Sequence, residues 1–133
     1  MGLLEEIARY LGSQGIGVYS DDPEQATIFI NHMPSSPDKI LAVYQRGGPE
    51  PFYWDPFDVP EVQVLVRGAV GEEWEVVERA NQVYAALHGL MNLNFGTINI
   101  IGITAINMPT SLGTDDLRRP EYTVSFLVHH VRR

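Results

Sequence analysis

The hydrophobic positions in the middle of the chain change their period from two to about 3.6. Val62, Val64 and Val66 alternate with Gln63, Leu65 and Arg67, which predicts a half-buried strand over residues 60–68. Apolar residues then recur at helical spacing, at Val76, Ala80, Val83, Leu87 and Leu90. Three glutamates crowd the first turn of this helix, where the helix dipole favours negative charge. The helix ends near Gly89.

The same patterns place the other elements. Residues 3–11 form a short amphipathic helix that stops at Gly12 or Gly15, where a glycine can take the left-handed cap. Strands are expected over residues 27–33, 39–45, 97–108 and 122–129, with a bulge or bend at Gly102. The order predicts one α+β domain over residues 1–133. Its mainly antiparallel sheet has about four to five strands, and two helices pack on one face.

Two segments are expected to be loops. Residues 47–60 hold four prolines and two glycines, so regular structure is excluded, yet they also hold four aromatic residues. Such a loop either folds back on its own core or meets another protein. Residues 109–120 are predicted to be a polar loop. In the second helix, Trp74 and Tyr84 widen the apolar stripe and are expected to pack against the core.

The composition is that of an ordinary globular protein. The chain has 133 residues, of which 44% are hydrophobic and 20% charged, and a net charge of −8. That charge disfavours binding to nucleic acid phosphates, and the doublets at 118–119 and 132–133 are expected to be solvated surface. The absence of cysteine excludes disulfides and thiolate chemistry. No basic leader or membrane-spanning run of about 20 apolar residues is present, so we expect a soluble protein without membrane partners.

Catalytic and metal-binding patterns are weak. Of the four histidines, only His129 and His130 are neighbours, and adjacent strand residues point to opposite faces. The acidic pairs fall in predicted loops, and no Gly-x-Ser-x-Gly elbow occurs. The glycines of residues 12–17 follow a helix, so they indicate a helix stop and a turn and not a phosphate loop. We therefore expect no enzyme activity, no metal and no cofactor.

Several segments together carry a resemblance to a known family. They are LEEIARYLG at 4–12, YQRGGP at 44–49, PEVQVLVRG at 60–68, VYAALHG at 83–89 and SLGTDDLRRPEYTVSF at 111–126. In order and spacing they resemble the phage tail terminator, or tail completion, proteins, often labelled minor capsid proteins in genomes and prophages. The resemblance covers nearly the whole chain, and its segments are structural in kind.

The resemblance implies a virion protein at the head-proximal end of the tail, assembled in the host cytoplasm. Proteins of this kind form a hexameric ring that stops polymerisation of the tail tube protein and offers a surface to the head–tail connector protein. An acidic ring suits the passage of DNA without specific binding. Ring closure uses different patches on the two sides of a subunit. The candidate interface residues are Phe52, Tyr53, Trp54 and Phe57 in the aromatic loop, and Ser111, Leu112, Asp115, Arg118 and Arg119 in the polar loop.

Two other functions stay open at this stage. A head–tail connector or stopper is also a small ring former, and the position of the gene beside that of the major tail protein would favour the terminator. A small host α+β enzyme or ligand-binding domain would need a polar pocket with converging histidine, serine and acidic residues. A thermal-shift response to a ligand or metal would favour that third function.

Overall fold

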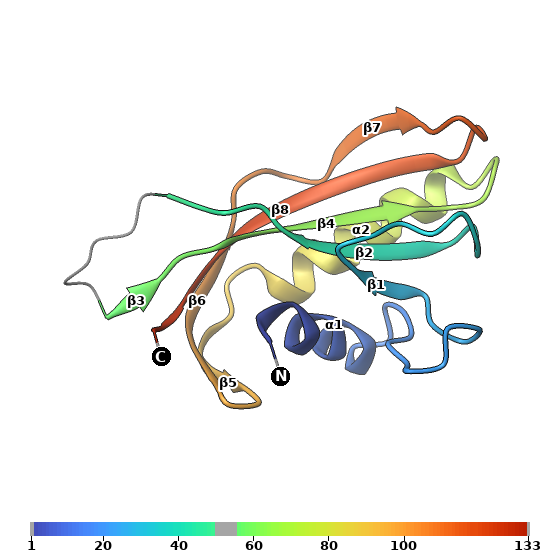
Figure 1. The fold of residues 1–133 in the computed structure, drawn as a ribbon. Helices are drawn as coiled ribbons and strands as arrows, with labels where there is room; N and C mark the ends of the chain where they lie inside the picture. The colour runs from blue at the N-terminus through green and yellow to red at the C-terminus, as the bar shows by residue number, and fades with distance from the viewer. Residues whose placement is uncertain (1, 50–55, 133) are drawn as a thin grey trace.

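A computed structural model describes residues 2–49 and 56–132 of the chain (Figure 1). The two helices are α1 (Leu3–Ser13) and α2 (Glu73–Leu87). The strands in chain order are β1 (Ile28–Ile30), β2 (Ile40–Gln45), β3 (Phe57–Asp58), β4 (Glu61–Arg67), β5 (Met91–Phe95), β6 (Ile98–Ala105), β7 (Thr110–Thr114) and β8 (Pro120–Val131).

The strands form one sheet with the order β1-β2-β4-β8-β6-β5, and β3 and β7 also pair with β8. Only β1 and β2 pair in parallel among the described strands; every other pairing is antiparallel. The prediction of a mainly antiparallel α+β fold is confirmed. The predicted four to five strands are too few, because the described residues alone form eight.

Both helices pack on the same face of the sheet. Val62, Val64 and Val66 of β4 are fully buried and belong to one core cluster with Ile7 and Leu11 of α1 and the apolar stripe of α2. The stripe is the predicted one, with Val76, Ala80, Val83 and Leu87 buried. Alternation along β4 therefore directs one set of side chains to the helices, as the sequence pattern requires.

Strand β8 is the longest element of the sheet. Its 12 residues pair with β4 and β3 along one side and with β6 and β7 along the other. Strand β7 lies beside residues 120–123 of β8, whereas β3 lies beside residues 130–131. At about 3.3 Å per residue, the two ends of β8 are roughly 35 Å apart. In Figure 1 β7 and β3 accordingly lie toward opposite ends of the molecule.

Two loop predictions are wrong, and one strand was not predicted. Helix α2 ends at Leu87, close to Gly89 as expected, but residues 91–95 form the unpredicted strand β5. The segment 109–120 contains β7, because β8 offers a free side to which residues 110–114 can bond. Residues 47–60 contain the short strand β3. Three residues predicted to lie at an interface, Phe52, Tyr53 and Trp54, are outside the residues that the structure describes.

Trp74 does not pack as expected. Its side chain is 84% exposed in the first turn of α2, where the stripe of buried residues has not yet begun. Tyr84 packs against the core as predicted. The bulge at Gly102 is confirmed by a register shift between Ile100 and Gly102, and α1 stops as expected, with Gly15 at φ 77°. No helix in the described part of the chain is long and apolar enough to cross a membrane.

Candidate assembly surfaces

Five of the nine candidate residues lie in one hairpin. We call residues 106–119, which connect β6 to β8 and include β7, the β7 arm. Ser111 and Leu112 lie in β7, where all five residues are exposed, so the strand is held by its pairing with β8 and covered by neither helix. Asp115, Arg118 and Arg119 follow in the turn that leads back into β8.

Asp115 organises this turn. Its Oδ1 accepts hydrogen bonds from the backbone amides of Leu117 (3.0 Å) and Arg119 (2.9 Å), and its Oδ2 accepts from Nε of Arg119 at 2.8 Å. Arg118 takes a left-handed backbone conformation, with φ 64°, and its side chain is exposed. An aspartate that bonds to the backbone of its own turn fixes the chain reversal. The prediction that Asp115 is a turn residue is confirmed.

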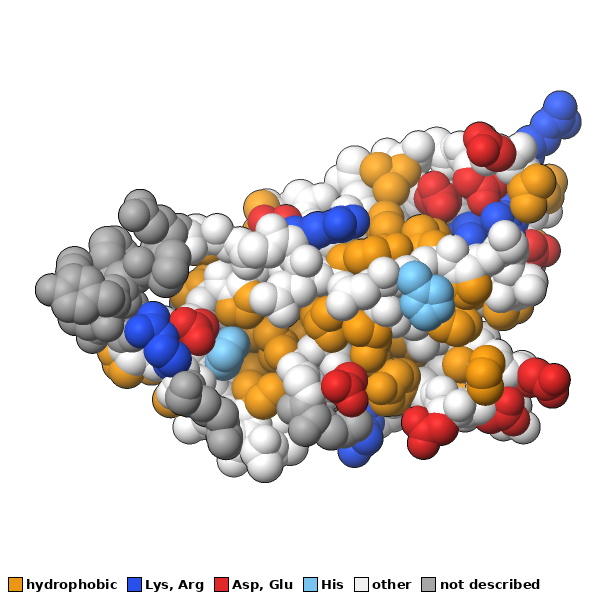
Figure 2. All heavy atoms as spheres, in the orientation of Figure 1, with side chains coloured by type: hydrophobic (Ala, Val, Ile, Leu, Met, Phe, Trp, Pro, Cys, Tyr) orange, Lys and Arg blue, Asp and Glu red, His pale blue; other side chains and the backbone are white. Residues whose placement is uncertain are grey.

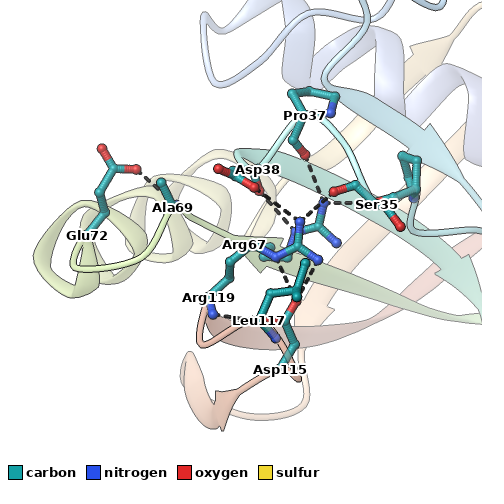
Figure 3. Close-up of polar contacts among 10 residues, drawn as sticks. Ser35, Pro37, Asp38, Arg67, Ala69, Glu72, Asp115, Leu117 and Arg119 are labelled. Atoms are coloured by element: carbon teal, nitrogen blue, oxygen red, sulfur yellow. Dashed lines mark hydrogen bonds and ion pairs between the residues drawn. The ribbon is translucent and has the colours of Figure 1, made fainter.

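Arg119 is buried, which contradicts the prediction that the doublet at 118–119 is solvated surface. Only 5% of Arg119 is exposed. Its Nη1 donates to the carbonyl of Ser35 at 2.5 Å and pairs with Asp38 at 3.2 Å, while its Nη2 lies 2.8 Å from Asp115 (Figure 3). The sequence could not reveal these contacts, because Ser35 and Asp38 are more than 80 residues away along the chain.

A second buried arginine holds the same loop. Arg67, at the end of β4, is 3% exposed and donates to the carbonyls of Pro34, Pro37 and Asp38 at 2.7–3.0 Å. Figure 3 shows the two guanidinium groups side by side between the loop that precedes β2 and the turn at Asp115. We call Arg67 and Arg119 with their partners the arginine clamp. It fastens residues 34–38 and the β7 arm to the sheet.

The clamp shifts the ionisation of its members. Burial, and then the charge of Arg119, lower the pKa of Arg67. Burial alone would lower the pKa of Arg119, but hydrogen bonds to Asp115 and Asp38 outweigh it and raise that pKa. Burial would raise the pKa of Asp115, yet the bonds from Arg119 and Leu117 hold it below its usual value. The Asp115–Arg119 pair is therefore ionised at neutral pH.

The arm carries exposed apolar side chains. Ile106, Met108, Leu112 and Leu117 are each about half exposed or more. Of these four, only Leu112 is among the candidates predicted from the sequence. A signal was present, since residues 80–114 contain no Asp, Glu, Lys or Arg in a chain with 20% charged residues. In Figure 2 apolar side chains gather in the middle of the visible face, and most acidic side chains lie toward its right-hand end.

Phe57 is far from the arm. It lies in β3, 39% exposed, and pairs with Val131 at the other end of β8. The neighbouring Asp58 forms an ion pair with Arg132 at 2.9 Å, which ties β3 to the end of β8. Among the candidate residues that the structure describes, Phe57 thus lies at one end of β8 and the five residues of the β7 arm lie at the other.

No group of three or more His, Cys, Asp or Glu side chains suited to a metal ion occurs within residues 2–49 and 56–132. The surfaces described above offer exposed apolar side chains and backbone edges. Their chemistry suits contact with another protein.

Comparison with known proteins identifies the family. The family described as "Bacteriophage tail terminator protein" matches residues 10–132. The chain belongs to the bacteriophage tail terminator family. Tail terminators are structural proteins of the virion, and this favours a non-enzymatic role for the chain. No curated protein matches it significantly.

A solved structure supports the fold of this tail terminator. A chain from the virion of a native gene transfer agent particle superposes with a TM-score of 0.67, covering 98% of this chain and 95% of that one. The two sequences are 13% identical, so the likeness shows a shared fold. The α+β arrangement with two helices on one face is therefore also found in a virion component.

The turn at Asp115 gives a pH-dependent prediction. The pKa of Asp115 is lower in the folded protein than in the unfolded chain, where it is about 4. The ionised carboxylate therefore stabilises the fold at any pH above the unfolded pKa. This contribution disappears as the pH falls through the folded pKa. We expect Asp115→Asn to lower the melting temperature between about pH 5 and pH 8, and the difference from wild type to shrink below about pH 4.

Melting curves by circular dichroism across this pH range measure the effect. Asp116→Asn is the matched control, because Asp116 is exposed in the same turn, and we expect it to leave the melting temperature unchanged. Equal effects of the two substitutions, or a difference that does not change with pH, would contradict the role given to Asp115.

Proposed function

We propose that this tail terminator caps the tail tube as a hexameric ring, ends polymerisation of the tube protein and offers the joining surface to the head–tail connector. The observation that carries the proposal is the family match over residues 10–132, nearly the whole chain. Such a ring sits at the head-proximal end of the tail and is built in the host cytoplasm.

The separation of the candidate surfaces supports this function. A cap must bind the tube on one side and the connector on the other, while each subunit also contacts two neighbours. The β7 arm and strand β3 lie at opposite ends of β8 and form two distinct surfaces, as a subunit with several protein partners requires. Their separation is set by strand length, so they stay apart without a second domain.

The net charge also suits the proposed position. Each subunit carries a charge of −8, so a ring of six copies repels the phosphates of DNA that passes through it. Repulsion of this kind lets DNA move through the ring without being held. The proposal therefore includes no specific nucleic acid binding.

An assembly reaction with the tube protein of the same phage tests the capping function. We expect addition of this chain to stop growth, so that tubes measured by electron microscopy become shorter as its concentration rises. Bovine serum albumin at equal concentration serves as the negative control. Tubes that grow to the same length with and without the chain would overturn the proposal, and binding only to the connector would favour a head–tail connector.

The aromatic loop at residues 52–57 is proposed as one contact of the ring, since aromatic residues dominate the energy of many interfaces. We expect Trp54→Ala to weaken capping, so that about ten times as much protein is needed to give the same tube length. Trp74→Ala is the matched control, because Trp74 is the other tryptophan and is 84% exposed on α2. Unchanged capping and oligomeric mass for Trp54→Ala would remove the loop from the interface.

A further inference from the structure

The half of the sheet next to the arginine clamp has two edge strands on opposite sides. There the strands lie in the order β7-β8-β4-β2-β1, so β7 forms one edge and β1 the other (Figure 1). Natural monomers usually guard such edges with lysine or other charged residues. Residues 106–114 of the β7 arm and residues 25–37 around β1 contain no charged residue.

The β7 edge presents apolar side chains outward. Met108, two residues before β7, is 63% exposed, and Leu112, within β7, is 49% exposed. All five residues of the strand are exposed. Exposed apolar side chains grouped on an unguarded edge are typical of a surface that another protein covers. The arginine clamp holds this edge in place through buried contacts, so the arm is already ordered before it meets a partner.

The β1 edge presents a hollow. A concave space of about 380 Å³ lies beside β1, and most of its lining is apolar or aromatic. Its apolar and aromatic walls are formed by Tyr19, Pro23, Ala26, Ile28, Phe29 and Ile30, and its polar lining residues are Ser20, Asp21 and His32. The ring of His32 bonds to the Ile30 carbonyl at 3.2 Å and stacks edge-on against Phe29, which leaves the hollow bordered by an ordered wall.

We propose that the β7 arm of one subunit packs into the hollow beside β1 of the next subunit, with Leu112 and Met108 as its apolar contacts. This inference rests on the ring of the proposed function and names the seam between its subunits. The occupant is a second copy of this chain, because the same subunit carries an uncharged edge at β7 and, on the opposite side of the sheet, a mostly apolar hollow in which Asp21 is the charged lining residue. A projecting surface on one side and a receiving surface on the other is the arrangement that a head-to-tail ring requires.

Cysteine cross-linking tests the seam, because the chain contains no cysteine of its own. Leu112→Cys is combined with His32→Cys in one variant and with Pro23→Cys in another, so that both borders of the hollow are sampled. The control variant combines Met91→Cys with His32→Cys, since Met91 is 68% exposed on β5, outside the proposed seam. Rings purified alone or formed on tubes are oxidised and separated on a non-reducing gel.

We expect at least one of the two seam variants to give a ladder of bands up to six subunits, and the Met91 control to remain at one subunit. A mixture of the single variants, Leu112→Cys with Pro23→Cys or with His32→Cys, should stop at two subunits, because each protein then carries one reactive side. Leu112→Cys on its own should give no cross-link in a head-to-tail ring. A dimer of that single variant, or a ladder from the Met91 control alone, would overturn the proposed seam.

The outcomes separate the seam from the function. Rings of unchanged mass that cap tubes but give no ladder would refute the seam and leave the proposed function standing. A ladder from a protein that does not limit tube length would support the seam and refute capping. If the wild-type chain forms no oligomer, alone or on tubes, both proposals are wrong.

Discussion

Strand β8 organises the described sheet, because β3, β4, β6 and β7 all pair with it. Its residues Val124, Phe126 and Val128 are fully buried, so the strand runs through the core as well as through the sheet. Because β8 is longer than β4 or β6, its two ends extend past them and provide pairing for β3 and β7. The length of one strand therefore places two accessible surfaces at opposite ends of a small protein. This separation suits the proposed contacts with more than one protein partner.

The arginine clamp determines the geometry at one of these ends. Two guanidinium groups buried side by side repel each other and lose hydration, so they persist only where hydrogen bonds and opposite charges compensate. Here three backbone carbonyls surround Arg67, and two carboxylates and a carbonyl surround Arg119. The clamp ties β7 to the loop before β2, which keeps the exposed arm in a defined position. A rigid edge loses less conformational entropy when it binds than a free loop does.

Local patterns predicted the parts of the fold whose stability is local. The alternation in β4 and the stripe of α2 identified both elements and the side chains that they bury. Strand β7 was missed because Thr-Ser-Leu-Gly-Thr has no alternating pattern, and it is a strand only because β8 lies beside it. The sequence wrongly predicts a surface position for Arg119, because the partners that bury it, Ser35 and Asp38, are distant along the chain. The family resemblance predicted the candidates in residues 111–119. The structure joins them in one hairpin through pairing with β8 and contacts to residues 35 and 38, and none of these contacts is visible in a short segment of sequence.

We propose that this tail terminator works as a closed ring of identical subunits at the end of a tube. Light scattering after gel filtration measures this most directly, over a range of concentrations and in the presence of short tubes of the tube protein. For a hexameric ring we expect a mass six times the 14.9 kDa of one chain, either for the free protein or as the mass gained at one tube end. A protein that stays at 14.9 kDa at high concentration and adds no mass to tubes would contradict it.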